Sequence, residues 1–444
     1  MAGADTMRKG YHDLLRREIL ELIPSTAKSI LDLGCGAGNL GKALKQQQNC
    51  VVHGVELSRE ASTIAEKNLD RVWTDNLNRF DPTFCNRKYD TLVFADILEH
   101  LISPWTVLKK FSSVLADDGV IIASIPNVAH PWILQNLKDG LFRYEPAGIL
   151  DITHLRFFTK TTIFQMFAQC GLKIINFRPW PSAENPVQYH VTAVRPQLKF
   201  KDPTTTILIL TYNGWEYTEQ CINSIKINTK TPYKILVIDN GSTDGTVDRL
   251  RADRTVLHIE NSQNLGFGKG FNLGLMLVDT PYFVLSNSDV VVTKDWLSRM
   301  TYHIEEDKKL LILGARSNHV SGPQLITEVP YIDNASLEKY AAEGLRSSKH
   351  PITYFPRIVF FFVLLKSIAL QKVGFLDEIF GLGNFEDDDY CLRAIRAGYK
   401  TGFDNTVFIH HYGSRCFAIN KIDFAKLMQE NEQKFRTKWN IKDK

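Results

Sequence analysis

An apolar strand that runs straight into a glycine-rich turn is the feature that most constrains the fold of this chain. Residues 29–33, SILDL, have the unbroken apolar character of a buried strand, and a helix is expected to follow through Leu44. The turn carries Gly34, Gly36 and Gly38, which let the backbone approach a ligand closely at a helix N-terminus. The spacing G-x-G-x-G differs from the G-x-G-x-x-G of dinucleotide-binding folds. The block predicts an α/β sheet with a ligand site at its carboxyl edge.

Three more segments in the first half of the chain end in a carboxylate. Residues 50–57 end near Glu56, a third strand end supplies Asp75, and residues 89–96 end in Asp96. Because the carboxyl ends of parallel strands meet at one edge of a sheet, we expect these side chains to converge with the glycine turn. A carboxylate at the end of the second strand can bind both hydroxyls of a ribose.

The block LDLGCGAGN, residues 31–39, resembles the first motif of the class I S-adenosylmethionine-dependent methyltransferases, and the resemblance covers about residues 10–195. It implies a Rossmann-like sheet whose last strands, residues 172–180 and 188–196, form an antiparallel hairpin. It also implies S-adenosylmethionine as the cofactor. By this resemblance the cofactor contacts Asp32, Gly34, Gly36 and Gly38 along the methionine and ribose, Glu56 at the ribose, and Asp75 and Asn76 at the adenine.

Asp96 opens the block DILEHL, which is similar to one found in many small-molecule and sugar O-methyltransferases. The resemblance therefore implies methyl transfer to a hydroxyl oxygen, with Asp96 near the cofactor. The alternative is a non-catalytic scaffold that keeps the fold. Intact glycines and acidic residues disfavour that alternative.

The residue that takes the acceptor proton is harder to predict. S-adenosylmethionine already carries an activated sulfonium, so the protein has only to align the acceptor and remove its proton. For each candidate histidine a structural role is the favoured interpretation, and His154 is the catalytic hypothesis. The candidates are His100, His130 and the cluster 150–158, with Asp151, His154 and Arg156.

Residues 195–203, RPQLKFKDP, contain two prolines and several charges without periodicity, which is typical of a linker. They divide the chain into a predicted methyltransferase domain, residues 1–197, and a second α/β domain, residues 203–444.

The second domain repeats the pattern of strands that end in polar residues. The segments 204–213, 233–239 and 282–285 read as buried strands, and a carboxylate at such an end suits Mg²⁺ or Mn²⁺ beside a diphosphate. For Asp289 alone, a capping role for the helix that begins near Trp296 is an equal alternative. Together the strand ends predict a nucleotide-diphosphate site with a metal. The residues that we expect at this site are Thr211, Asn213, Asp239, Asn264, Gly266, Asn287 and Asp289.

Residues 204 to about 420 resemble the inverting family 2 glycosyltransferases of the GT-A fold. The blocks that carry the resemblance are ILILTYN, VIDNGSTDGT, SNSD, GFLDEIFGLGNFEDDDYCLRAIRAGYK and FIHHYGS. By this resemblance Asp239 binds a pyrimidine base, Asp289 binds the metal, and the donor is a UDP- or dTDP-sugar. The bacterial rhamnosyltransferase-like branch is the most similar.

The resemblance also implies an acidic catalytic base and a histidine near the metal. Asp387 is the predicted base and Asp388 is its rival. Adjacent residues at a helix start point about 100° apart, so only one of the two side chains can face the donor. His410 is the predicted metal or pyrophosphate ligand and His411 its rival. Phe360, Phe361 and Phe362 stand where the family often has a small residue, which could narrow the acceptor side.

Composition sets the remaining limits. The net charge of +4 in 444 residues argues against a nucleic-acid partner, and scattered cysteines without a CxxC pair predict reduced thiols in the cytoplasm. The tail residues Phe424, Leu427, Phe435 and Trp439 predict a helix packed on its domain, and contact with the cytoplasmic face of the inner membrane is the minor alternative. The sequence thus predicts a bifunctional enzyme that methylates and glycosylates a glycan or lipid-linked glycan in bacterial surface-glycan assembly.

Overall fold

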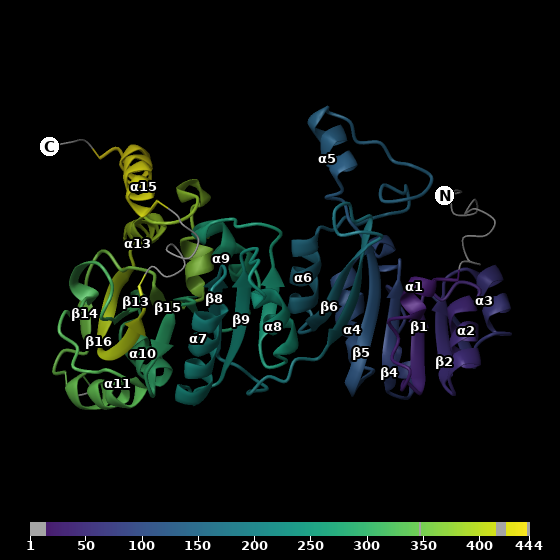
Figure 1. The fold of residues 1–444 in the computed structure, drawn as a ribbon, viewed down its shortest axis with the longest axis horizontal. Helices are drawn as coiled ribbons and strands as arrows, with labels where there is room; N and C mark the ends of the chain where they lie inside the picture. Colours follow the sequence, from purple (N-terminus) through teal and green to yellow (C-terminus); the bar gives the residue numbers. More distant parts are fainter. Residues whose placement is uncertain (1–14, 346–347, 414–422, 442–444) are drawn as a thin grey trace. The chain divides into compact units, whose positions relative to one another are not determined.

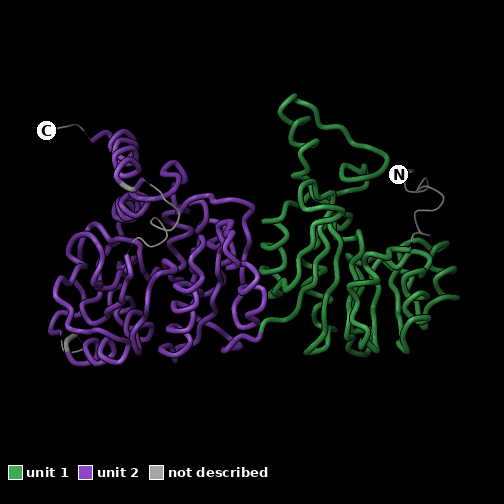
Figure 2. The backbone as a smooth tube through the Cα atoms, in the orientation of Figure 1, with its two compact units in different colours: residues 1–196 green, residues 197–444 purple. Residues whose placement is uncertain are grey.

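The computed structural model describes residues 15–345, 348–413 and 423–441. The chain divides into two compact units, residues 1–196 and 197–444 (Figure 2). Within the second unit, the backbone N–H of Gln197 donates to Arg254 O, and Lys199 Nζ donates to the carbonyls of Lys226 and Thr229. Residues in the predicted linker are therefore anchored to the second unit.

Unit 1 is built on a sheet of seven strands in the order β3-β2-β1-β4-β5-β7-β6 (Figure 1). The strands β1 to β5 are parallel, and β7 is antiparallel to both β5 and β6, so the predicted hairpin is confirmed. Every residue of β1 is buried, as its apolar sequence predicts. The strands are β1 (Ser29–Leu33), β2 (Val51–Glu56), β3 (Arg71–Thr74), β4 (Tyr89–Ala95), β5 (Leu115–Pro126), β6 (Lys173–Trp180) and β7 (Gln188–Val194).

Helices and short 3₁₀ turns connect these strands. Helix α2 begins after Gly38, whose φ of 77° few other residues tolerate, and a capping box of Thr159 and Thr162 starts α6. The helices are α1 (Arg17–Leu20), α2 (Asn39–Gln47), α3 (Arg59–Ala65), α4 (Pro104–Ser112), α5 (Pro131–Lys138) and α6 (Lys160–Gln169), with 3₁₀ turns η2 (Pro82–Cys85) and η3 (Leu98–His100).

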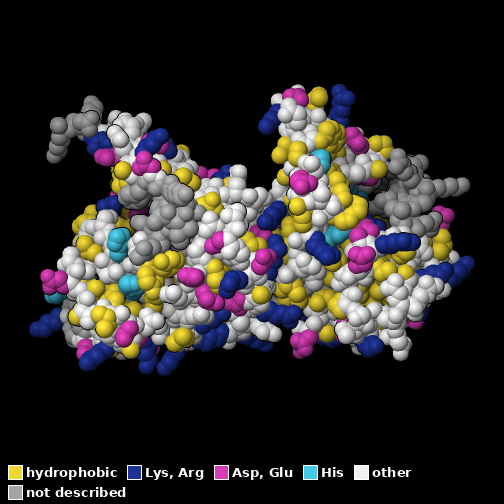
Figure 3. Space-filling view, viewed as in Figure 1, with side chains coloured by type: hydrophobic (Ala, Val, Ile, Leu, Met, Phe, Trp, Pro, Cys, Tyr) yellow, Lys and Arg dark blue, Asp and Glu magenta, His cyan; other side chains and the backbone are white. Residues whose placement is uncertain are grey.

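Helix α5 lies on an arm that leaves the sheet of unit 1 (Figure 1). Three of its apolar side chains, Trp132, Leu134 and Leu137, are nearly half exposed. Figure 3 shows hydrophobic side chains gathered along this arm. The arm therefore presents apolar surface that unit 1 does not bury.

Unit 2 is built on a nine-stranded mixed sheet in the order β10-β9-β8-β11-β15-β13-β16-β12, with β14 paired to β16. The four strands β10, β9, β8 and β11 are parallel, and β15 joins them antiparallel to β11. The strands are β8 (Thr205–Thr211), β9 (Tyr233–Asp239), β10 (Leu257–Glu260), β11 (Tyr282–Asn287), β12 (Val290–Val292), β13 (Leu310–Arg316), β14 (Ile352–Tyr354), β15 (Phe362–Lys366) and β16 (Lys400–His411).

The helices of unit 2 complete its core. Trp296 of α10 is fully buried against the ring of Phe362, 4.9 Å away. The helices are α7 (Trp215–Asn228), α8 (Thr246–Ala252), α9 (Phe267–Leu275), α10 (Trp296–Glu306), α11 (Asn334–Tyr340), α12 (Ile368–Lys372), α13 (Glu386–Arg396) and α15 (Phe424–Trp439), with η4 (Gly322–Gln324), η5 (Ala341–Leu345) and η6 (Glu378–Phe380).

The C-terminal helix α15 packs on unit 2, as predicted. The ring of Phe435 lies 5.6 Å from that of Phe385, and Trp439 Nε1 donates to a carboxylate oxygen of Asp389. Asn431 is fully buried and its amide donates to the carbonyls of Phe380 and Gly383. The side chain of Phe424 lies outside those described. Across the described residues, helices fall short of the length and apolarity that a bilayer span requires.

Candidate active sites

The glycine turn of unit 1 and the end of β2 form one structure. Glu56 is buried, and its two carboxylate oxygens accept hydrogen bonds from the backbone N–H groups of Gly36 (2.9 Å) and Ser58 (2.8 Å). These bonds fix the carboxylate against the turn. Asp32, at the end of β1, is also buried, and burial together with the negative charge of Glu56 raises its pKa to about 7. A cationic ligand would relieve this concentration of negative charge.

The other predicted cofactor residues lie at the neighbouring strand ends. Asp75 is exposed after β3, and its backbone N–H donates to Glu56 O at 2.9 Å. The side chain of Asn76 accepts hydrogen bonds from Asn78. Asp96 follows β4 with a φ of 49°, accepts a hydrogen bond from Ser124 Oγ, and pairs with a guanidinium nitrogen of Arg16. The predicted convergence of these strand ends therefore matches the sheet order.

The histidine candidates of unit 1 differ in their surroundings. His130 caps α5, and its Nδ1 accepts from Trp132 N. His154 is buried, and its Nδ1 lies 2.9 Å from Ile149 O. Burial lowers the pKa of His154, so the ring is neutral near pH 7. Of the other candidates, Asp151 bonds Thr153, and Arg156 donates to backbone carbonyls, which are structural roles.

A cavity of about 910 Å³ opens in unit 2. This is within the usual size of small-molecule sites, roughly 300–1,000 Å³. Among the predicted residues, its lining includes Thr211, Asn264, Gly266, Asn287, Asp289, Asp387 and Asp388. Asp239, Asn213 and His410 are outside that lining.

Asp289 lies on the cavity wall beside His411. Its Oδ1 is 3.2 Å from His411 Nε2, whereas the N-cap of α10 is Asp295, so Asp289 does not cap that helix. The ring of Phe361 stacks on His411 at 5.2 Å. Burial opposes the charged form of His411, but the hydrogen bond and charge of Asp289 outweigh it and raise the pKa of the imidazole.

The strand register decides which of the two adjacent histidines, His410 or its rival His411, lies beside Asp289. In the β12–β16 pair, His411 lies opposite Val290 and His410 opposite Val291. Because side chains alternate along a strand, His410 points to the other face, where its Nδ1 lies 2.7 Å from the hydroxyl of Tyr331. His411, the rival in the sequence, is therefore the histidine that faces Asp289.

The first turn of α13 brings three carboxylates to the cavity. Asp387 Oδ2 accepts from Phe360 N at 3.3 Å, and Asp388 Oδ1 pairs with Arg357 Nε at 2.7 Å. Burial, reinforced by the charge of Asp387, raises the pKa of Asp388 to about 7 and that of Glu386 to about 8. Burial also raises the pKa of Asp387. Raised pKa values are common for carboxyl groups at functional sites, where a proton acceptor works best with a pKa near the working pH.

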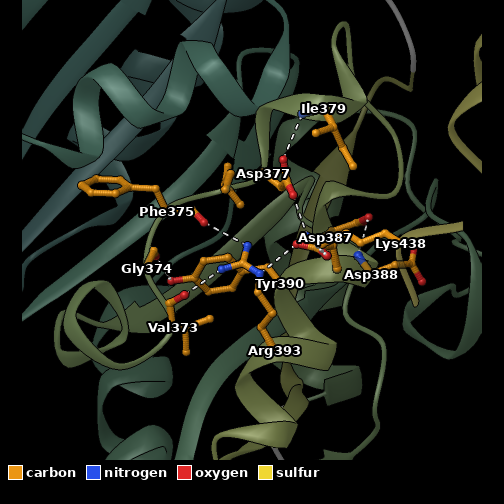
Figure 4. Close-up of polar contacts among 12 residues, drawn as sticks. Val373, Gly374, Phe375, Asp377, Ile379, Asp387, Asp388, Tyr390, Arg393 and Lys438 are labelled. Atoms are coloured by element: carbon orange, nitrogen blue, oxygen red, sulfur yellow. Dashed lines mark hydrogen bonds and ion pairs between the residues drawn. The ribbon is translucent and has the colours of Figure 1, made fainter. Parts of the chain in front are cut away.

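The part of α13 that follows its first turn is anchored to a neighbouring loop (Figure 4). Arg393 donates to the carbonyls of Val373 and Phe375, at 2.7 and 2.9 Å, and the Tyr390 hydroxyl donates to Gly374 O. These contacts fix the direction of the helix and hence of Asp387.

The predicted base-binding residues surround a turn next to the cavity. Asp239 is fully buried and accepts from the N–H groups of Gly241 and Ser242, each at 3.1 Å. Burial raises its pKa to about 6. Asn213 Oδ1 accepts from Thr243 N, and Thr211 shares a 2.7 Å hydrogen bond with Thr218. Next to this turn, the side-chain amide of Asn240 donates a hydrogen bond to the side-chain oxygen of Asn264.

Gly266 is required by close packing: a Cβ there would lie 1.9 Å from Gly381 O. Arg357 was not predicted as a site residue. Its position just before the three phenylalanines was a sequence feature that could have indicated it. His319, whose carbonyl lies 2.7 Å from His411 Nδ1, had no local signal.

The two sheets define the class of each unit. The order β3-β2-β1-β4-β5-β7-β6 with one antiparallel strand is that of a methyltransferase-type Rossmann-like unit, and the mixed sheet of unit 2 with Asp289 at a strand end is that of a GT-A glycosyltransferase unit. Family models give the particular assignment. Residues 7–176 match the model "Methyltransferase domain", and residues 206–368 match "Glycosyl transferase family 2". The chain joins a methyltransferase domain to a family 2 glycosyltransferase domain.

Curated relatives match parts of the chain. An uncharacterized glycosyltransferase of Haemophilus influenzae is 28% identical and covers 26% of this chain and 36% of its own length. The ubiquinone biosynthesis O-methyltransferase of Haemophilus ducreyi is 30% identical, with 28% and 61% covered. The O-antigen chain rhamnosyltransferase RfbN of Salmonella typhimurium is 23% identical, with 46% and 65% covered. The chain thus spans between 36% and 65% of the length of these relatives.

Two solved structures are similar to parts of the chain. GalNAc-T7 with UDP, GalNAc and Mn²⁺ is 16% identical with a TM-score of 0.37 and covers 47% of this chain and 43% of its own. Magnesium protoporphyrin IX methyltransferase from Synechocystis, with bound SAH, is 20% identical with a TM-score of 0.31, with 42% and 83% covered. Both scores are low, so the assignment of the units rests on the strand order and the family models.

Proposed function

We propose that this protein is a bifunctional enzyme of bacterial surface-glycan assembly. Unit 2 transfers a sugar from a nucleotide-diphospho-sugar with inversion, and unit 1 transfers a methyl group from S-adenosylmethionine to a sugar hydroxyl. The observation that carries the proposal is the pairing of Asp289 with His411 in the same cavity as Asp387. The rhamnosyltransferase relative supports a deoxyhexose or hexose donor and a glycan acceptor.

The residues around Asp289 fit a divalent cation. The 3.2 Å between Asp289 Oδ1 and His411 Nε2 is close to the roughly 3 Å that separates neighbouring ligands of an octahedral ion with bonds of about 2.1 Å. His411 Nδ1 donates to the carbonyl of His319, which leaves Nε2 as the ligand atom in the neutral ring. Bound Mg²⁺ or Mn²⁺ would compensate the charge of the leaving diphosphate.

The carboxylates of α13 supply the base. An inverting transfer is a single displacement, so one group must take the acceptor proton as the new bond forms. Asp387 has this role, oriented by Phe360 N, while Arg357 holds Asp388 beside it. Phe360 and Phe361 narrow the cavity on the acceptor side.

The nucleotide contacts the parallel strands of unit 2. Asp239, with Asn213 and Thr211 near it, binds the pyrimidine base and ribose, and Asn264, Gly266 and Asn287 border the path to the diphosphate. A UDP- or dTDP-sugar fits this arrangement.

Unit 1 binds S-adenosylmethionine by its strand ends. Glu56 accepts the ribose hydroxyls, Asp75 and Asn76 flank the adenine, and Asp96 lies near the methionine part. The fixed carboxylate of Glu56 suits the ribose hydroxyls, and the buried carboxyl group of Asp32 suits the positively charged methionine part of the ligand.

The proposal is tested with a panel of nucleotide sugars and Mn²⁺, using thermal stabilisation of the full chain followed by turnover on glycan acceptors. Stabilisation by one donor, dependent on Mn²⁺ and lost in Asp289→Ala, is expected. Binding of S-adenosylmethionine without turnover on any acceptor would instead assign unit 1 a scaffold role.

A further inference from the structure

A group of metal-ligating side chains lies in unit 1 outside the residues proposed to bind S-adenosylmethionine. Glu99 and His100 belong to η3 after β4, and His154 belongs to the loop that precedes α6. One ligand atom from each of the three residues lies within 4.8 Å of the other two. The rings of His100 and His154 are 4.7 Å apart. Segments distant in the sequence thus bring two imidazoles and one carboxylate together.

Hydrogen bonds fix the same tautomer in both histidines. His154 Nδ1 lies 2.9 Å from the carbonyl of Ile149, and His100 Nδ1 lies 3.2 Å from that of Thr153. A carbonyl oxygen only accepts, and the Thr153 hydroxyl, which is also 3.2 Å from His100 Nδ1, donates its own hydrogen to Asp151, so Nδ1 carries the proton in each ring. The neutral rings therefore keep Nε2 as a lone-pair donor, the arrangement that backbone carbonyls impose on metal-binding histidines.

The side chain of Glu99 gives an independent indication of a cation site. Its side chain is 1% exposed, and neither carboxylate oxygen has a hydrogen-bond partner among the described residues. Its backbone carbonyl, in contrast, accepts from Leu155 N and Arg156 N, which ties η3 to the loop of His154. A buried carboxyl group without a partner is costly, and a cation held with the two Nε2 atoms would remove that cost.

The cluster lies close to the glycine turn. Ile97, two residues before Glu99, packs so near Gly34 that a Cβ on the glycine would lie 2.8 Å from the isoleucine Cδ1. The same short segment thus connects the turn proposed for the cofactor with the cluster.

We propose that Glu99, His100 and His154 bind a divalent first-row transition metal. Imidazole ligands favour such metals over Mg²⁺ and Ca²⁺. Zinc bonds of about 2.0–2.2 Å hold tetrahedral ligands roughly 3.4 Å apart, a separation that lies within the 4.8 Å limit on the three ligand atoms. Three protein ligands leave a position for an exchangeable oxygen ligand. Resting on the proposed function, that ligand is the hydroxyl of the methyl acceptor.

The site is tested on the full chain carrying Asp289→Asn, so that the proposed cation site of unit 2 does not contribute. Metal-free protein is titrated with Co²⁺, whose visible absorption reports imidazole coordination, and then with Zn²⁺ in competition. One equivalent of Co²⁺ per chain is expected. Glu99→Gln and His154→Gln should each lower Co²⁺ affinity by more than about 100-fold, the upper range for loss of a mere supporting contact.

His53→Gln is the matched control, because His53 is another partly buried histidine of unit 1, with its Nδ1 2.7 Å from the Tyr89 hydroxyl. It should bind Co²⁺ as the parent does. If the buried variants fail to fold, the less buried His100→Asn replaces them. Absence of stoichiometric Co²⁺, or unchanged affinity in these variants, overturns the site. S-adenosylmethionine affinity measured without metal separates this failure from failure of the proposed function.

Discussion

The two units build their candidate sites from different kinds of chain segment. In unit 1 the predicted cofactor residues lie at or just after the ends of β1 to β4, from Asp32 to Asp96, and backbone N–H groups fix the carboxylate of Glu56. In unit 2 the site joins the parallel strands to β16 and α13, so Asp289 meets His411 from far along the chain. The first site is a run of local motifs, and the second depends on long-range strand pairing. We therefore expect a substitution in one site to impair the reaction of that unit and to leave the reaction of the other unit unchanged.

The largest expected effect is on sugar transfer alone. Asp289→Ala should lower it by more than about 10³-fold, because metal stabilisation of the leaving diphosphate is worth several kcal/mol. Methyl transfer by the same preparation should remain unchanged. The measurement is turnover of both reactions. Asp279→Ala, at an exposed aspartate of the same unit, is the control. Sugar transfer that persists in EDTA would contradict the proposal that the reaction requires a bound divalent cation.

The next effect separates the two neighbouring carboxylates. Asp387→Asn should keep donor binding and lose about 10²–10⁴-fold in sugar transfer, since it removes the general base. The rate of the parent should fall as the pH decreases through the raised pKa of the base, which becomes protonated. Asp388→Asn is the control. An inactive Asp388→Asn beside an active Asp387→Asn would reverse the assignment, and the inflection near pH 7 would then belong to Asp388.

A smaller effect is expected in unit 1. Glu56→Gln should weaken S-adenosylmethionine binding by about 1.5–3 kcal/mol, because charge-assisted hydrogen bonds to the ribose are lost. Calorimetry measures the affinity, and sugar transfer should be unaffected. Glu60→Gln, an exposed glutamate at the start of α3, is the control. Parental affinity in Glu56→Gln would remove Glu56 from the site.

Stability provides a finer test of unit 2. Asn431→Ala should lower the free energy of unfolding of unit 2 by about 1–3 kcal/mol, because the buried carbonyls of Phe380 and Gly383 lose their donor. Chemical denaturation measures it, with Gln433→Ala, exposed on the same helix, as the control. Equal changes in both variants would show that the buried hydrogen bonds of Asn431 add no stability.

The smallest effect is expected from dividing the chain. A cut between Pro196 and Gln197 leaves Lys199 with its partners in unit 2, so residues 1–196 and 197–444 should each be soluble and retain their own reaction on a supplied acceptor. Coupled product should fall when the two halves are mixed at low concentration. Insoluble fragments would mean that the units share a core. If the mixed halves form as much coupled product as the intact chain at every dilution, joining the units in one chain does not help to pass a common acceptor between them.

Local patterns of buried strands and glycine turns were enough to predict two α/β domains, and the resemblance of particular sequence blocks to known families supplied the two fold classes. The block 31–39 predicts the turn that the structure contains, and Glu56 at the end of β2 and Asp96 after β4 lie at the predicted edge. Asp289 was also predicted from its place at a strand end. Each of these depends on contacts between residues that are close in the sequence or on the parallel order of a sheet.

Tertiary structure alone decided which of two adjacent histidines faces Asp289. A strand alternates its side chains with a period of two, so the choice between His410 and His411 depends on the register of β16 against β12, which no local pattern specifies. Three other contacts are likewise long-range. Arg357 pairs with Asp388, Asn431 binds the loop that precedes α13, and Glu99 lies near His154. Their residue types are visible in the sequence, but their proximity follows from packing that only the folded chain determines.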